Sequence, residues 1–391
     1  MDSTPLLVIV AVLLALNAAS SLYVLAAIRC VRAFARREAP TGEFQPPVTV
    51  LKPVCGLEAE LHENLLSFCL QSYPEFQVIF GIRDPADPAR GVVERLIREH
   101  PDLDLSLVVN ERAPGANLKI SNLSNMYPAA KHPVILIADS DMRVDSSYLA
   151  NVVAPLEDAS VGAVTCLYRA RSRRDIPSSL ASLQINESFL PSVLVSLMRR
   201  ELDFCLGATM VVRRKALEAI GGFRALEDYL ADDHMLGRLV SQQGFTVVLS
   251  GYLVDNVVHE KGFRSLIAHE LRWARTIRTV APWGHAFSFV MYILPVTMVT
   301  ALLSELAFGS DLIEWVLNAS ALALRMRMHR TVGRALGTSD WRDTWLVPVR
   351  DVLGLGVWLV SLFGRHVNWK GRDFTVLSSG HISPPADMEQ A

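Results

Sequence analysis

Short apolar runs and helical patterns alternate through the middle of the chain. The apolar runs lie at residues 48–54, 76–84, 105–109, 134–138, 162–167 and 245–249. Amphipathic helical patterns separate the first four of them, at residues 58–71, 89–99 and 118–130. Strands that alternate with helices at this spacing are typical of a parallel sheet with helices on both faces. We therefore expect an α/β domain at residues 46–260, with a Rossmann-like and mostly parallel sheet.

A long uncharged run near the N-terminus predicts a membrane helix. Residues 5–28 contain no charged side chain, and at about 1.5 Å per residue this run is long enough to cross a membrane interior. A signal peptide is the alternative, with cleavage near Ala18-Ala19-Ser20. However, basic residues follow the run and none precedes it, which favours a membrane anchor. We expect residues 1–37 to be this helix and its basic flank, in the inner membrane, with the following domain in the cytoplasm.

The C-terminal third contains further membrane segments. Residues 261–282 repeat apolar positions at steps of three and four between arginines, which predicts an amphipathic helix in the membrane interface. Within residues 286–370, we expect a second span at 286–306, a weaker one at 312–324 and a third at 345–363. Basic clusters follow both of the last two segments, so we expect one of them to be interfacial or re-entrant. The result is a multi-pass protein whose residues 371–391 form a tail, without order from residue 379.

Charge and cysteine content exclude some functions. The net charge is −2 with a pI of about 6.6, so the composition does not indicate a nucleic-acid binder. The five cysteines form no C-x-x-C pair, which fits a reducing compartment and does not indicate a zinc site.

Two carboxylates end the apolar run at 134–138. Asp139 and Asp141 follow it as Asp-Ser-Asp. Ligands bind at the carboxyl ends of strands in open α/β sheets, and two hard oxygen ligands there suit Mg²⁺ or Mn²⁺. Asp84 ends another run, although an Asp before Pro85 is also typical of a turn. An isolated D-x-D is usually a solvated turn, but the chain has no glycine-rich phosphate loop here, so a metal is the expected partner for phosphates.

Asp232 and Asp233 begin a later amphipathic helix. Acidic residues at this position usually cap the helix or interact with its dipole. The alternative is that one of them is a general base, because a neighbouring carboxylate raises the pKa of the other. Arg272 and Trp273 present a similar choice between contacts with lipid and contacts with a bound substrate. The segment at 177–200 either shapes an acceptor pocket or packs on the sheet.

The order of these residues resembles a known family. Asp84, the D-x-D, the Asp pair and His269-x-x-Arg272-Trp273 follow the pattern D, D-x-D, (E/D)D, (Q/R)-x-x-R-W of inverting glycosyltransferases with the A-type fold. Local sequence at about residues 46–376 most resembles the ceramide glucosyltransferase family, and within it the bacterial hopanoid-biosynthesis glycosyltransferases, as in VTVLKPVCGLEAELHENL, LKISNLSN, ADSDMRV, DFCLGATMVVRRKALEAIGG and VNWKGRDF. The four-part order is far more specific than any one part.

The resemblance implies a role for each matching residue. Asp84 would hold the uracil or ribose of a UDP-sugar, and Lys119, Asn122 and Asp232 would lie near this donor. Asp139 and Asp141 would hold the metal and diphosphate. The catalytic residues would be Asp233 as the base, with Arg272 and Trp273 at the diphosphate and the acceptor entrance. His269 stands where the family has Gln or Arg, and Asp232 where it more often has Glu.

Several functions compete at this stage. The first is transfer of N-acetylglucosamine from a UDP-sugar to bacteriohopanetetrol, a membrane lipid alcohol, with a divalent cation as cofactor. The alternative is glucose transfer to ceramide, and polysaccharide synthesis is disfavoured because few C-terminal segments are available for a channel. A non-catalytic membrane scaffold is the hypothesis from another class. No nucleic acid is expected as a partner, and the sequence identifies no protein partner.

Overall fold

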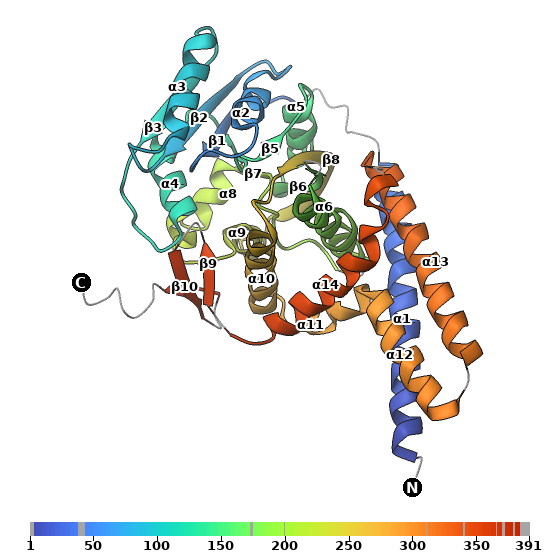
Figure 1. Ribbon diagram of the computed structural model, residues 1–391. Helices are drawn as coiled ribbons and strands as arrows, with labels where there is room; N and C mark the ends of the chain where they lie inside the picture. Colours follow the sequence, from blue (N-terminus) through green and yellow to red (C-terminus); the bar gives the residue numbers. More distant parts are fainter. Residues whose placement is uncertain are drawn as a thin grey trace, which may run out of the picture. The chain divides into compact units, whose positions relative to one another are not determined.

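The structure is a computed structural model in which two compact units can be described. The described residues are 4–37, 44–172, 175–198, 200–309, 311–338, 341–364, 366–369, 372–377 and 380–383. The helical unit contains Met1–Arg37, Ser172–Arg200 and Glu260–Gly364. The sheet unit contains Glu38–Arg171, Glu201–His259 and Arg365–Ala391. Figure 1 shows the helices and strands of both units.

An eight-stranded sheet is the centre of the sheet unit. Its strand order is β3-β2-β1-β4-β7-β6-β8-β5, and the first four strands are parallel. They are β1 (Val48–Pro53), β2 (Phe76–Ile82), β3 (Leu105–Val109) and β4 (Val134–Ile137). The rest of the sheet is formed by β5 (Met142–Arg143), β6 (Val161–Ser172), β7 (Met210–Arg213) and β8 (Thr246–Val258). β7 runs antiparallel to both β4 and β6, so the expected α/β sheet is mixed, with a parallel half.

Alternating side chains of the strands build a core on each face of this sheet. Val134, Leu136 and Ala138 pack on one face with α2 (Leu61–Cys69), α3 (Ala89–Glu99) and α5 (Tyr148–Val153). Ile135 and Ile137 point to the other face, covered by α4 (Leu118–Met126), α8 (Arg214–Ala219) and α9 (Asp232–Gln242). A strand that is apolar at every position and buried on both sides is what a parallel sheet requires. The short 3₁₀ turns η1 (Tyr127–Ala129), η2 (Ala154–Glu157) and η4 (Gly222–Leu226) complete the connections.

A small antiparallel sheet ends the described chain. It consists of β9 (His366–Trp369), β10 (Arg372–Val376) and β11 (Ile382–Ser383), in the order β11-β10-β9. Our expectation of no order from residue 379 onward was therefore wrong for β11, because Ile382 is buried with Leu230, Phe374 and Val376. The rest of the expected tail, residues 384–391, lies outside the described residues.

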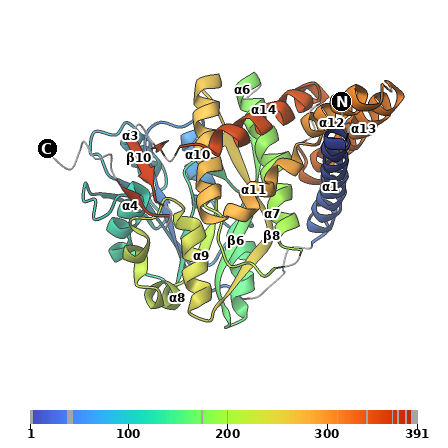
Figure 2. The same ribbon diagram turned by 90° about the horizontal axis from the view of Figure 1, so that it is seen from below.

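The helical unit combines long apolar helices with shorter amphipathic ones. It contains α1 (Thr4–Phe34), α6 (Ile176–Leu183), the π-helix η3 (Gln184–Phe189), α7 (Leu190–Ser196), α10 (Phe263–Val280), α11 (Pro282–Phe287), η5 (Ser288–Met291), α12 (Ile293–Phe308), α13 (Asp311–Leu336), η6 (Trp341–Asp343) and α14 (Leu346–Ser361). Both ribbon views show α1, α12 and α13 side by side (Figures 1 and 2). The segment at 177–200 belongs to this unit.

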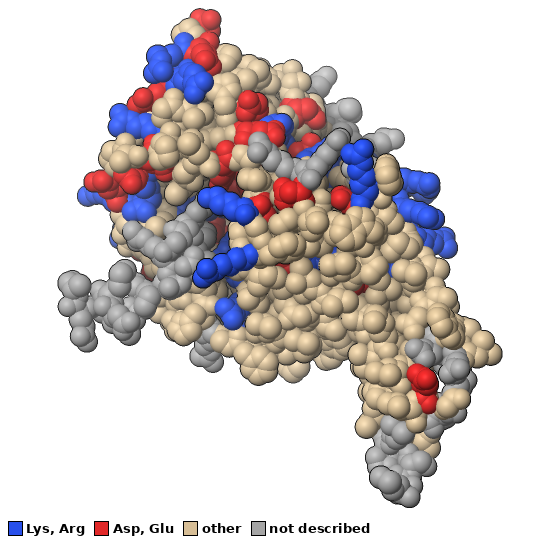
Figure 3. Space-filling model, viewed as in Figure 1, with Lys and Arg blue, Asp and Glu red and all other residues tan. Residues whose placement is uncertain are grey.

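Few helices of the described chain can cross a membrane. Leu7–Phe34 is long and apolar enough, and Pro282–Met291 with Ile293–Leu306 forms a second span if the two pieces, bent by 69°, are counted as one. Leu22 and Leu302 are more than half exposed, as expected for side chains that face lipid. Figure 3 shows mostly uncharged residues over this part of the helical unit. α13 and α14, which cover the expected weaker segments, contain buried charged residues.

Candidate functional site

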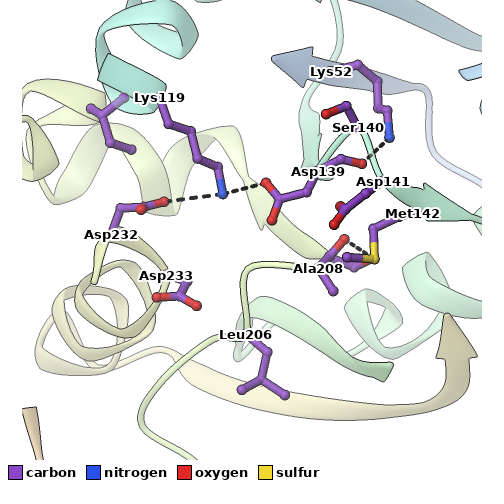
Figure 4. A network of polar contacts seen from close by, with 12 residues as sticks. Lys52, Lys119, Asp139, Ser140, Asp141, Met142, Leu206, Ala208, Asp232 and Asp233 are labelled. Carbon is purple, nitrogen blue, oxygen red and sulfur yellow. Dashed lines mark hydrogen bonds and ion pairs between the residues drawn. The ribbon is translucent and has the colours of Figure 1, made fainter. Parts of the chain in front are cut away.

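Lys119 joins two separate segments that carry carboxylates in the sheet unit. Its Nζ lies 2.7 Å from Asp139 Oδ1, just beyond β4, and 3.6 Å from Asp232 Oδ2, at the start of α9 (Figure 4). Burial by itself lowers the pKa of Lys119, but Asp139 and Asp232 outweigh it and raise the pKa. Lys119 therefore carries a positive charge beside both acidic motifs, and its expected contact with a donor remains a prediction.

Asp141 lies close to two other carboxylates, those of Glu58 and Asp139. Asn256 on β8 donates from Nδ2 to Asp141 Oδ2 over 2.9 Å, and Ser140 Oγ donates to Glu58 over 2.6 Å. Burial, followed by the charges of Glu58 and Asp139, raises the pKa of Asp141 to about 7. This carboxyl group is therefore held in a place where an added positive charge would stabilise its ionised form.

Lys52 is a site residue that the sequence analysis missed. It lies on β1 with no exposed surface, its Nζ donates to the backbone oxygen of Asp139, and Nζ is 3.6 Å from the ring centroid of Phe68. Burial lowers the pKa of Lys52 to about 7, although Asp139 and Asp141 act in the opposite direction. The available signal was a single lysine inside the apolar strand pattern VTVLKPV.

Asp233 faces the same space as Asp139. Its Oδ1 accepts a hydrogen bond from its neighbour's backbone, His234 N, over 2.7 Å. Gly207 borders both carboxylates: a Cβ there would lie 3.2 Å from Asp233 Oδ2 and 3.5 Å from Asp139 Oδ2. Burial is the main cause of a raised pKa at Asp233, and Lys119 opposes it. Burial also raises the pKa of Asp232, to about 6, against the effect of Lys119.

Asn117 is the second residue that the sequence analysis missed. It is fully buried, and its Oδ1 caps α4 by accepting from Lys119 N and Ile120 N. Its Nδ2 donates to Tyr229 O over 2.8 Å and to Asp232 Oδ1 over 3.3 Å. One side chain therefore holds the helix that carries Lys119 next to the loop that precedes the Asp pair.

The small C-terminal sheet holds the other side of this loop. Ile382 N donates to Asp228 O over 2.8 Å, and Leu230 N donates to Gly380 O over 3.2 Å. The rings of Tyr229 and His381 lie 4.1 Å apart. The loop before Asp232 is therefore held by Asn117 and by the small C-terminal sheet.

Two of the expected donor-binding residues have local structural contacts. Asp84 is exposed two residues beyond β2, and its Oδ1 accepts from Ala86 N over 2.8 Å, as in an Asx turn. Asn122 is buried on α4 and donates to Gly81 O over 2.8 Å. β2 is separated from β4 only by β1, so Asp84 lies at the same edge of the sheet as Asp139. Their contacts with a donor remain predictions.

Arg272 and Trp273 belong to the helical unit. Both lie on α10, where the ring of Trp273 is 4.5 Å from His269 and 6.5 Å from Phe189. His269 Nδ1 is 2.9 Å from Glu260 Oε1. This contact with Glu260 orients the His269 ring beside Trp273. The expected roles of Arg272 and Trp273 toward diphosphate and acceptor remain predictions.

The carboxylates suit a divalent cation only in part. The described residues contain no group of three or more His, Cys, Asp or Glu side chains that could hold a metal ion. Asp139 and Asp141 supply two hard oxygen donors, and burial together with the charges of Glu58 and Asp139 raises the pKa of Asp141. Mg²⁺ and Mn²⁺ commonly take one or two carboxylates and complete their shell with water and substrate phosphates. The donor set fits such a shared site and does not fit a closed protein cage.

Relatives of the chain include named lipid-modifying enzymes. Ceramide glucosyltransferase 1 of Caenorhabditis elegans is 27% identical over 207 residues, which are 52% of this chain and 44% of that relative. Ceramide glucosyltransferase 3 of the same organism is 21% identical over 346 residues, 87% of this chain and 75% of that relative. The first match thus spans less than half of the relative's length. The comparisons favour the ceramide alternative over the hopanoid assignment that we placed first.

The fold and the family follow from two further comparisons. The structure is similar to the mannosyltransferase PcManGT from Pyrobaculum calidifontis, solved with GDP-Man and Mn²⁺, with a TM-score of 0.58 and 22% identity over 90% of this chain and 99% of that one. This likeness confirms the expected A-type glycosyltransferase fold. The family model of glycosyl transferase family 21 matches residues 12–382. The chain is therefore a glycosyltransferase, and it belongs to glycosyl transferase family 21.

Proposed function

We propose that the protein transfers a hexose from a UDP-sugar to the hydroxyl group of a membrane lipid, with inversion at the anomeric carbon. The observation that carries this proposal is the convergence of Asp139, Asp232 and Asp233 around Lys119, with Asp141 beside them. A divalent cation bound by Asp139 and Asp141 would offset the negative charge of the diphosphate and stabilise it as it departs. Lys52 and Lys119 hold the loop and the helix from which these groups project.

Asp233 is the proposed general base. It takes the proton from the lipid hydroxyl as the oxygen attacks the anomeric carbon from the face opposite the diphosphate. The raised pKa of Asp233 makes it a stronger base than an ordinary aspartate. Asp232 is already engaged with Asn117 and Lys119, so it orients the donor side and does not compete for the proton. Arg272 would add positive charge at the diphosphate, and Trp273 would line the acceptor entrance.

Ceramide is the proposed acceptor, with glucose as the sugar. The names of the relatives support it, since both Caenorhabditis elegans proteins are ceramide glucosyltransferases. Bacteriohopanetetrol with N-acetylglucosamine is the second candidate, and it rests on the local sequence resemblance alone. In both cases α1 and the bent pair at 282–306 would anchor the protein in the inner membrane as a multi-pass protein, with the sheet unit in the cytoplasm.

A transfer assay with the purified full-length protein tests the proposal. UDP-glucose or UDP-N-acetylglucosamine is offered with ceramide or bacteriohopanetetrol in mixed micelles, with and without Mn²⁺, and products are identified by mass spectrometry. We expect a single-sugar glycolipid that requires the cation. A polymeric product would indicate a polysaccharide synthase, and absence of UDP release with every acceptor would favour a non-catalytic scaffold. Asp104→Asn is the matched control for replacement of the proposed base, Asp233→Asn, because Asp104 is an exposed carboxylate paired with Lys131.

A further inference from the structure

A chain of buried charged residues connects four elements inside the helical unit. None of its members belongs to the motifs of the sheet unit, and each is at most 9% exposed. The members are Glu187 on η3, Glu270 on α10, Arg325 and His329 on α13, and Arg350 and Asp351 on α14. Ionisable residues are costly inside the apolar part of a membrane protein, so a connected set of them calls for an explanation beyond packing.

The first link joins α10 to α14. Arg350 has no exposed surface and Glu270 is 6% exposed. Arg350 Nη2 donates to Glu270 Oε2 over 2.8 Å, and Nη1 donates to Oε1. Two parallel bonds from a planar guanidinium fix both the distance and the rotation of the two helices.

The second link runs from α14 through α13 to η3. Asp351, the neighbour of Arg350, accepts from Arg325 Nε over 3.0 Å. Arg325 Nη1 donates to Glu187 Oε2 over 2.6 Å, and His329 Nδ1 lies 2.5 Å from Glu187 Oε1. Since Arg350 and Asp351 are adjacent in sequence, α14 serves as the common support for α10 and η3.

Two carboxylates of this chain are close in sequence to aromatic residues whose rings lie near each other. Glu270 is three residues before Trp273, which places the two on neighbouring positions of the α10 surface. Glu187 is two residues before Phe189 in the π-helix. Phe189 and Trp273 have ring centroids 6.5 Å apart. π-helical turns occur frequently at functional sites, and this one places a buried carboxylate and an aromatic ring within one turn.

We infer that Glu270–Arg350 and Glu187–Arg325–Asp351 are positioning residues that hold α10 and η3 so that Trp273 and Phe189 form one acceptor-binding surface. The inference rests on the proposed function and assigns Phe189 to the lipid acceptor. Replacing a buried ion pair with apolar residues of similar size often leaves stability unchanged. It nevertheless removes the directional bonds, so positioning and stability can be separated by experiment.

The test is the double variant Glu270→Leu/Arg350→Met in the full-length protein. We expect a melting temperature close to that of the unchanged protein and an unchanged KM for the UDP-sugar. We expect kcat for lipid transfer to fall about 10- to 100-fold, as small misplacements of binding groups do. Hydrogen exchange at residues 263–280 should become faster, whereas residues 184–189, which Arg325 still holds through Glu187, should exchange as before. Arg330→Gln, at an exposed position of the same unit, is the matched control and should leave all four quantities unchanged.

The outcomes separate this inference from the proposed function. Full transfer and unchanged exchange rates in a stable double variant would overturn the inference while the proposed function stands. No transfer by the unchanged protein would contradict the proposed function, and the exchange rates would still decide whether the pair positions α10. If the double variant does not fold, Arg350→Lys retains the charge without the two parallel bonds and takes its place. It should lose about 10-fold in kcat at an unchanged melting temperature.

Discussion

Buried charges serve different purposes in the two units. In the sheet unit, Asp139, Asp141, Asp232 and Asp233 outnumber the nearby cations, Lys52 and Lys119. In the helical unit every carboxylate of the buried chain meets an arginine or histidine at hydrogen-bonding distance: Glu270 with Arg350, Asp351 with Arg325, and Glu187 with Arg325 and His329. Among the described residues, the carboxylates of the sheet-unit group exceed these two lysines in number, whereas each carboxylate of the buried chain in the helical unit has a positively charged partner.

We relate the difference to function: the carboxylates of the sheet unit are the proposed ligand-binding groups, and the paired charges of the helical unit connect its helices. Burial, followed by the charges of neighbouring carboxylates, raises the pKa of Asp141 to about 7 and that of Asp232 to about 6, and such shifts cluster at functional sites. In a matched pair such as Glu270–Arg350, each charge is offset by its partner. Changes in the sheet unit should therefore affect chemistry first, and changes in the helical unit should affect geometry and stability first.

Asp233→Asn should produce the largest loss of activity. General bases contribute about 10²- to 10⁴-fold, so transfer should fall by that factor while UDP-sugar binding, measured by calorimetry, is retained. Because burial raises the pKa of Asp233, activity of the unchanged protein should decline as pH falls through that raised pKa. Asp232→Asn should retain more activity. Turnover near the unchanged level in Asp233→Asn would contradict its role as base.

Removal of the divalent cation should have the next largest effect. A bound cation is worth several kcal/mol at a departing diphosphate, so chelation should reduce transfer about 100-fold. A proton competes with the metal for Asp141, whose pKa is raised to about 7. The Mn²⁺ concentration that gives half of the maximal rate should therefore fall as pH rises from about 6 to about 8. A rate that is unaffected by chelator across this range would show that the carboxylates act without a metal.

The sequence could predict the features of the fold that depend on local patterns. The alternation of strands and helices up to Ile137 was predicted because each apolar pattern is local. β6 and β8 are longer than expected because charged residues continue both strands, where Arg169 Nη2 donates to Asp255 over 3.4 Å. The span expected at 286–306 is bent, and Pro295 near the start of α12, without a backbone N–H, fits a new helix start there.

The sequence likewise revealed the site residues that adjoin a locally predictable element and missed those whose partners are distant in the chain. The Asp-x-Asp and Asp-Asp motifs are visible because each follows or begins an element that can be predicted locally. Lys52 and Asn117 were missed because their partners are far away in the sequence, with Asn117 and Asp232 separated by 115 positions. The buried chain of the helical unit was not predictable either, since only folding brings Glu187 next to Arg325.

Arg325→Met tests the paired charges of the helical unit through its effect on the free energy of unfolding. The variant leaves Asp351 without this arginine and Glu187 with His329 alone, in a buried setting. Removing one partner of a buried pair typically costs about 3–5 kcal/mol, measured by thermal or denaturant unfolding in detergent. Lys119→Met in the sheet unit is the informative contrast, because Asp139 is 35% exposed and water can stabilise it. A smaller loss of stability for Arg325→Met than for Lys119→Met would refute the distinction between the two units.

Arg90→Gln should have the smallest effect, and it shows that burial decides the outcome. Arg90 Nε lies 2.7 Å from Glu94 Oε1, as close as Lys119 lies to Asp139. The side chains of Arg90 and Glu94, however, are about two fifths exposed. Exposed pairs four residues apart on a helix contribute about 0.3–0.5 kcal/mol, because water already solvates both charges. Urea unfolding of the variant should therefore show at most a small shift, and lipid transfer should be unchanged. A loss as large as that of Arg325→Met would mean that ion-pair distance, and not burial, ranks the charges of this protein.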